Sequence, residues 1–133
     1  MIVQHNPIYL PYTEIKKYRT IFKEHGYTVT NDYSGGRKLE FWFYDKKLYA
    51  TIEHLSIGFA INVVPLIFNR KKRLEIVKYQ IRIEYGGTEL MCGVYYHDFV
   101  ENEKDLRTKL ERQIEMIKKE KSYIELEKIE NTT

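Results

Sequence analysis

The chain has 133 residues, of which 43% are hydrophobic and 31% charged, a composition typical of one folded domain. Its formal net charge is only +3, which argues against a DNA mimic, because such a protein needs a dense excess of carboxylates. The single cysteine, Cys92, excludes an internal disulfide and any multi-cysteine zinc site, and it favours a reducing compartment.

Neither a signal peptide nor a membrane span is visible in the sequence. Residues 1–7 lack the basic and apolar blocks of a signal peptide. The longest uncharged apolar stretch, which we take as residues 55–68, ends before the polar Asn69; its 14 residues are too few to cross a bilayer. We expect a cytoplasmic protein with no membrane partner. Alanine occurs twice, whereas lysine and isoleucine each occur 15 times, a usage typical of AT-rich genomes such as those of many Gram-positive bacteria and their phages.

A first helix is predicted between residues 13 and 25. Pro7 and Pro11 keep the preceding segment extended, and Thr13 is the expected N-cap. Gly26 is suited to the left-handed position that closes a helix. Apolar residues recur at helical spacing and form one face, namely Ile15, Tyr18, Ile21 and Phe22.

Alternating apolar and polar residues then predict an antiparallel meander of five or six strands. The segments with this pattern, or with an uninterrupted apolar run, are residues 27–33, 38–44, 48–53, 55–68, 77–85 and 90–96. Turn residues separate them, including a basic stretch at 69–73 that we expect to be the tip of a hairpin. Pro65 marks a bulge or the end of its strand.

Residues 103–128 predict a long C-terminal helix, with Asn102 as its N-cap and Asp105 as a weak capping-box partner. About 26 helical residues span roughly 39 Å, more than the width of a five-stranded sheet. The 120–133 end is therefore either a solvated tail or a protruding helix offered to a partner, for example in a homodimer. The predicted fold is a single α+β domain, residues 1–133, with both terminal helices packed on one face of the meander.

The sequence contains no pattern that identifies a catalytic, metal or cofactor site, and we expect none of the three. The four histidines lack metal-ligand spacing, and the two glycine pairs lack a phosphate-binding motif. Two doublets, Glu53-His54 and His97-Asp98, lie at expected strand ends, but sequence neighbours on a strand point to opposite faces. Cys92 lies among apolar residues and is expected to be an inert core residue.

The strand at 38–44 leaves two interpretations of its aromatic residues open. Alternation places Glu40, Trp42 and Tyr44 on one face and Leu39, Phe41 and Phe43 on the other. If the helices leave the Trp42 face uncovered, its rings are available to stack on nucleic-acid bases or to form a protein-binding hot spot. If the helices cover that face, the rings belong to the core.

The predicted contact residues combine this aromatic face with nearby basic side chains. They are Trp42, Tyr44, Arg37, Lys38, Arg70, Lys71, Lys72, Arg73 and Arg82. In this interpretation the basic side chains meet the phosphates of a nucleic acid or the acidic groups of a protein partner.

Three functions remain as hypotheses. The first is a non-enzymatic protein that binds and modulates another protein or a protein–nucleic-acid complex, such as a phage or mobile-element factor that inhibits a host defence nuclease. The second is direct nucleic-acid binding through the 70–73 tip and the aromatic strand. The third is a small ribonuclease or toxin-like hydrolase that uses His54 or His97 with Glu53, Asp98 or Tyr96.

Overall fold

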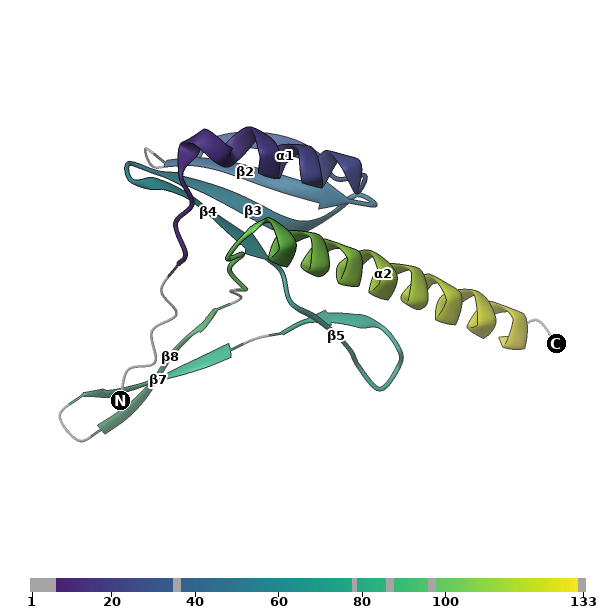
Figure 1. Cartoon of the computed structure of the whole chain (residues 1–133). Coiled ribbons are helices and arrows are strands. Elements are labelled where there is room, and N and C mark those ends of the chain that lie inside the picture. Colours follow the sequence, from purple (N-terminus) through teal and green to yellow (C-terminus); the bar gives the residue numbers. More distant parts are fainter. Residues whose placement is uncertain (1–6, 35–36, 78, 86–87, 96–97, 132–133) are drawn as a thin grey trace.

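The computed structural model describes residues 7–34, 37–77, 79–85, 88–95 and 98–131, and for residues 33, 34, 37, 79–85 and 88–95 it describes the backbone alone. A 3₁₀ turn, η1 (Tyr12–Glu14), leads into α1 (Ile15–Glu24), and α2 (Glu103–Asn131) ends the chain. The strands between the helices are β1 (Thr28–Ser34), β2 (Arg37–Tyr44), β3 (Lys47–Leu55), β4 (Gly58–Val63), β5 (Leu66–Phe68), β6 (Leu74–Ile76), β7 (Tyr79–Tyr85) and β8 (Thr88–Tyr95). The predicted α+β class is confirmed (Figure 1).

The sheet is smaller than the predicted meander. Strands β1 to β4 form one antiparallel sheet in chain order, while β5–β6 and β7–β8 are separate two-stranded hairpins. The interruption lies at Val64 and Pro65, between β4 and β5. Proline has no N–H to donate to a sheet ladder, and the carbonyl of Pro65 instead accepts a hydrogen bond from the N–H of Val77 at 2.9 Å. The predicted strand at 55–68 is therefore divided among β3, β4 and β5.

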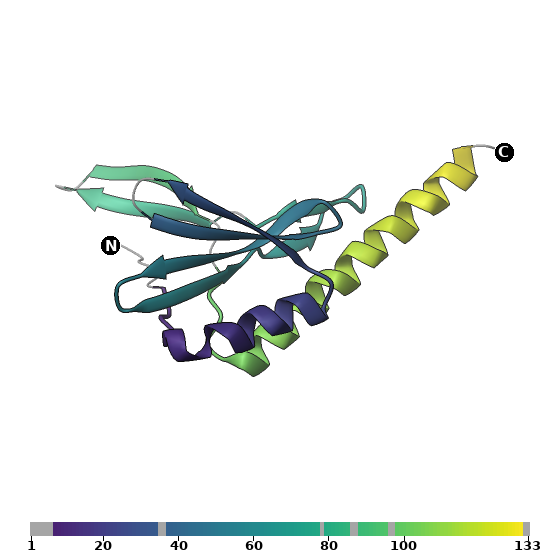
Figure 2. The same cartoon turned by 90° about the horizontal axis from the view of Figure 1, so that it is seen from above.

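The outer edge of β4 anchors the segments that precede both helices. Leu10 and Phe59 exchange two backbone hydrogen bonds, of 2.7 and 2.9 Å. Further along β4, the N–H of Val63 donates to the carbonyl of Asp98, and the N–H of Val100 donates to the carbonyl of Ile61, both at 2.9 Å. Because both connections begin at the same edge, α1 and α2 lie on the same side of the sheet, as Figure 2 shows.

The core lies between this pair of helices and the sheet. Tyr18, Ile21 and Phe22 of α1 are buried, and the ring of Phe22 stacks on the indole of Trp42 with centroids 4.5 Å apart. Leu106 and Leu110 of α2 are fully buried in the same core. The predicted packing of both helices on one face of the sheet is confirmed.

The helix ends agree with the sequence at three of the four predicted signals. Gly26 has a φ of +88° and follows α1, and the side-chain oxygen of Asn102 accepts a 2.8 Å hydrogen bond from the N–H of Asp105. The carboxylate of Asp105 accepts from the N–H of Glu101 at 3.0 Å, so the capping box is shifted by one residue. Thr13 is not the N-cap, because the carbonyl of Pro11 accepts from the N–H of Glu14 and closes the 3₁₀ turn first.

One buried polar side chain fixes α2 to the sheet. Gln113 is 4% exposed, and its amide nitrogen donates to the carbonyls of Tyr49 at 3.0 Å and Val64 at 2.8 Å. Its amide oxygen accepts from the hydroxyl of Tyr27 at 2.8 Å. Tyr49 is the extra residue of a bulge between β2 and β3, and its carbonyl also accepts from the N–H of Val64 at 2.8 Å. Val64 follows the end of β4, so Gln113 binds the sheet where the regular strand pairing ends.

Two parts of the chain extend beyond this core. The end of α2, residues 125–131, is exposed throughout and projects past the sheet (Figure 1). The β7–β8 hairpin extends away from the sheet and from both helices (Figure 1). Within the part of the chain that the structure describes, no helix has the length and apolar character needed to cross a membrane.

Candidate functional site

The Trp42 face of β2 is core, which corrects the interpretation of Trp42 and Tyr44 as exposed contact residues. Trp42 is 0% exposed beneath Phe22 of α1. Tyr44 is half-buried, and its ring packs on that of Tyr27 with centroids 5.1 Å apart. The apolar side of α1 packs on this face and covers it, so these side chains share one core.

The opposite face of β2 carries a row of apolar side chains on the side away from both helices. Leu39, Phe41 and Phe43 alternate with the buried residues and are half-buried. Together with Leu48, which pairs with Phe43 and is 38% exposed, they form what we call the open face. The sequence separated this row from the Trp42 row but did not identify it as the row that the helices leave uncovered.

Polar residues flank the open face on both sides. In the strand register Phe41 lies between Thr30 of β1 and Thr51 of β3, and Thr51 lies beside Asn62 of β4. An apolar row with a polar rim is the arrangement found at the centre of protein–protein contact surfaces.

A second cluster lies on the covered side of the sheet, around the carboxylate of Glu40. Arg19 of α1 donates through Nε to Oε1 at 3.0 Å and through Nη2 to Oε2 at 2.6 Å. His54 of β3 forms a short hydrogen bond through Nε2 to Oε2. An ionised carboxylate only accepts hydrogen bonds, so Nε2 of His54 carries the proton. Glu40 itself is 1% exposed.

The ionised form of Glu40 is stabilised by these two partners. Burial raises the pKa of the Glu40 carboxyl, but the hydrogen bonds from Arg19 and His54 outweigh burial, and the pKa is lowered overall. Tyr12 stacks on the ring of His54 with centroids 5.7 Å apart and restricts its orientation. The arrangement holds a charged cluster between α1 and the sheet.

This cluster corrects the predicted partner of His54. Glu53 pairs with Leu39 and therefore lies on the open face, whereas His54 lies on the covered face with Glu40. The carboxylate of Asp98 instead forms an ion pair with Lys109 of α2 at 2.8 Å. Tyr96 and His97 lie outside the described residues. Pairing across strands, which the sequence does not specify, decides which carboxylate reaches the histidine.

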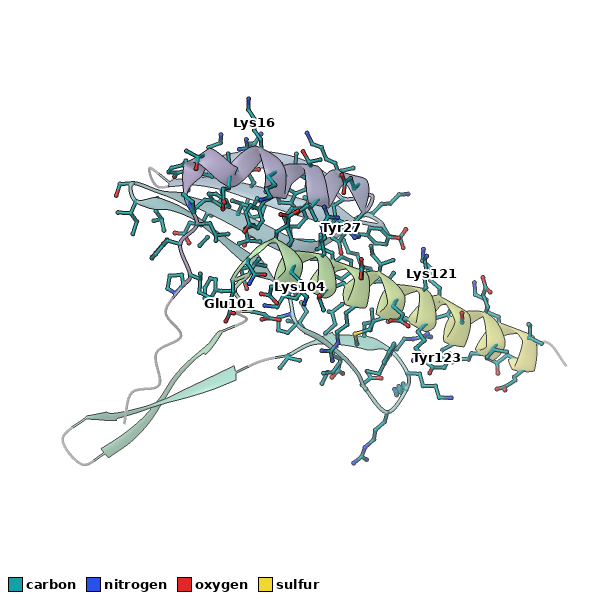
Figure 3. All side chains as sticks on the ribbon, in the orientation of Figure 1. Lys16, Tyr27, Glu101, Lys104, Lys121 and Tyr123 are labelled. Atoms are coloured by element: carbon teal, nitrogen blue, oxygen red, sulfur yellow. The ribbon has the colours of Figure 1, made fainter. Side chains whose placement is uncertain are left out.

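The basic tip between β5 and β6 is confirmed as a turn, but it lies against α2 instead of standing free. Arg73 forms an ion pair with Glu127 at 3.0 Å, and the ammonium of Lys72 lies 4.8 Å from the ring centroid of Tyr123. Figure 3 shows Tyr123 on the side of α2 that faces this hairpin. Arg70 and Lys71 are exposed and form no ion pair among the described residues.

The remaining predicted contact residues are distributed over other elements. Lys38 lines a pocket between β2 and α1. Arg37 begins β2 and Arg82 lies in β7, where the backbone alone is described. Across the residues that the structure describes, no group of three or more histidine, cysteine, aspartate or glutamate side chains is placed to hold a metal ion.

Comparison with known proteins adds no relative. No protein-family model matches the chain, and neither a curated protein nor a solved structure is significantly similar to it. The geometry of the open face and of the Glu40 cluster is therefore the basis for the proposals below.

Proposed function

We propose that this protein is a non-enzymatic binding protein that recognises another protein through the open face. The observation that carries the proposal is the row of Leu39, Phe41 and Phe43, which lies on the face of β2 opposite the side chains that pack against the helices. Apolar side chains on a sheet gain free energy when a second surface covers them, by roughly 25 cal/mol for each Å² removed from water. A protein partner with a complementary apolar surface supplies that cover.

The composition of the face fits a protein partner better than a nucleic acid. Of the four residues that define it, two are aromatic and none is charged, and the charged residues that pair with Leu39 at its end are the acidic Asp32 and Glu53. Aromatic residues are enriched in the centres of protein interfaces, where charged residues are depleted. Backbone recognition of a nucleic acid requires lysine and arginine instead.

The amino-acid usage of the chain suggests which kind of binding protein it is. Few alanines and many lysines and isoleucines are typical of an AT-rich genome, which favours a phage or mobile-element accessory factor in a Gram-positive host. Such a factor binds a host protein or protein–nucleic-acid complex, for example a defence nuclease, and blocks the surface that the host protein uses.

Affinity capture from a host lysate tests the proposal with a matched pair of variants. Phe41→Asp places a charge in the centre of the open face, whereas Ile57→Asp places the same charge in the β3–β4 turn, at a side chain that is 73% exposed. We expect one stoichiometric partner with the wild-type chain and with Ile57→Asp. With Phe41→Asp the affinity should fall by at least about 30-fold, as at a hot-spot residue. Equal capture by all three chains would contradict the proposal.

A second function, direct nucleic-acid binding, is favoured by the exposed side chains of Arg70 and Lys71, which form no ion pair with any residue that the structure describes. If these residues contact phosphates, the logarithm of the binding constant should fall with the logarithm of salt concentration, by about 0.9 for each phosphate neutralised on duplex DNA. The double variant Arg70→Gln/Lys71→Gln should then reduce the magnitude of this slope by about 1.8, the contribution of two phosphate contacts. A salt-independent affinity would exclude this function.

A further inference from the structure

A pocket of about 290 Å³ lies between α1 and the first two strands of the sheet. Three cationic side chains line it, namely Arg19 and Lys23 from α1 and Lys38 from β2. Glu40 supplies the carboxylate in the lining, so the lining holds three cationic side chains and one carboxylate, and Lys38 takes part in a further interaction as well. The pocket lies on the covered side of the sheet, and none of the residues that define the open face lines it.

The carboxylate of Glu40 binds Arg19 and His54. Both of its oxygens are already hydrogen-bonded, Oε1 to Arg19 and Oε2 to Arg19 and His54. Arg19 has five N–H donors, of which two bind Glu40 in these bonds. The carboxylate therefore holds the guanidinium in a fixed orientation, while other N–H groups of Arg19 remain for a ligand.

The indole of Trp42 supplies a second and independent observation. Trp42 also lines the pocket, and its Nε1–H is buried and has no hydrogen-bond partner among the described residues. A buried donor without an acceptor is rare in folded proteins and calls for an explanation such as a missing ligand. An oxygen atom bound in the pocket would provide that acceptor after a small displacement of the side chains that cover the indole.

We propose that this pocket binds a phosphate group. A phosphate offers several strong acceptor oxygens and up to two negative charges, which match the two lysines, the remaining donors of Arg19 and the indole N–H. The fixed Arg19–Glu40 pair provides an arginine whose planar donors are already positioned, the feature that suits arginine to phosphate recognition.

The chain contains a single tryptophan, so one indole N–H signal in a ¹H–¹⁵N spectrum reports on this pocket alone. The full-length protein is titrated with inorganic phosphate, and with sodium chloride at matched ionic strength and pH. We expect phosphate to shift the indole proton to lower field in a saturable manner, as a new hydrogen bond requires, and chloride to leave it unchanged.

Two charge-removing variants and one matched control complete the test. Lys23→Gln and Lys38→Gln should each weaken phosphate binding by about tenfold, the loss of one charge-assisted contact. Lys16→Gln removes the same charge from the outer side of α1, where Figure 3 shows Lys16 pointing away from the sheet, and should bind like the wild-type chain. An indole signal that phosphate does not move, or an equal loss of affinity in Lys16→Gln, would overturn the proposal.

Discussion

Phe41 and Trp42 are neighbours in β2, yet Trp42 is fully buried beneath α1 and Phe41 is half-buried on the face that both helices leave uncovered. Their difference follows from the alternation of side chains along a strand together with the position of the helices. It separates the aromatic residues that stabilise the core from those through which we propose that the chain binds a partner.

Truncation of these two residues should therefore have unequal effects on stability. Trp42→Ala leaves a large cavity against Phe22 and should lower the free energy of unfolding by about 3–5 kcal/mol. Phe41→Ala removes a partly exposed ring and should lower it by about 1 kcal/mol. Urea unfolding followed by circular dichroism measures both. Equal losses would mean that the open face is packed as tightly as the core.

Strand β2 shows most clearly what the sequence predicts and what it does not. Alternation alone assigns Glu40, Trp42 and Tyr44 to one face, because the period of a strand is fixed at two. Which face the helices cover depends on the pairing of β4 with the segments around Leu10 and Asp98, and no local pattern encodes those contacts. Local signals therefore predicted the elements, and long-range pairing determined which surface is exposed.

The Glu40 cluster likewise combines positions that the sequence predicts with pairings that only the fold determines. Arg19 lies beside the apolar stripe of α1 and Glu40 lies in the Trp42 row, so each position indicates a residue near the core. Their pairing joins residues 21 positions apart in the sequence, and His54 joins from a third element. A sequence predicts that such charges need partners when they are buried, but the fold selects the partners.

The lowered pKa of Glu40 predicts a loss of stability in acid. A carboxyl whose folded pKa lies below its unfolded value of about 4.3 stabilises the folded chain above that value. The contribution is lost as the pH falls through the folded pKa. Glu40→Gln should cost about 1–3 kcal/mol at neutral pH, because Arg19 and His54 lose an ionised acceptor. The variant should then lose less stability than the wild-type chain on acidification, as measured by urea unfolding across this pH range.

Gln113 should be essential to the docking of α2. Gln113→Leu keeps the approximate size of the side chain but removes the partner of the Tyr27 hydroxyl and of the Val64 carbonyl, whereas the carbonyl of Tyr49 keeps its hydrogen bond from the N–H of Val64. We expect a loss of about 2–4 kcal/mol in the free energy of unfolding. Arg112→Leu, at the exposed neighbouring position, should change it by less than about 0.5 kcal/mol. A mild effect of Gln113→Leu would show that water replaces these hydrogen bonds.

Gly58 should tolerate alanine less well than Gly26. At Gly58 the φ is +153°, and an added Cβ would collide with the backbone carbonyl of Leu10, which is hydrogen-bonded to Phe59. At Gly26 the φ is +88°, and the nearest neighbour of a Cβ is a ring carbon of Tyr44 at an ordinary 3.5 Å. Gly26→Ala should cost about 1–2 kcal/mol from backbone strain alone. Gly58→Ala should cost more, and faster amide hydrogen exchange at Leu10 should accompany it.

Photo-cross-linking tests recognition through the open face most directly. A photoreactive phenylalanine analogue is incorporated in place of Phe41 in one chain and in place of Ile57 in another, and each chain is irradiated in a lysate of an AT-rich Gram-positive host. We predict a single dominant cross-linked protein from position 41 and none from position 57. A product from position 57 with none from position 41 would contradict recognition through this face.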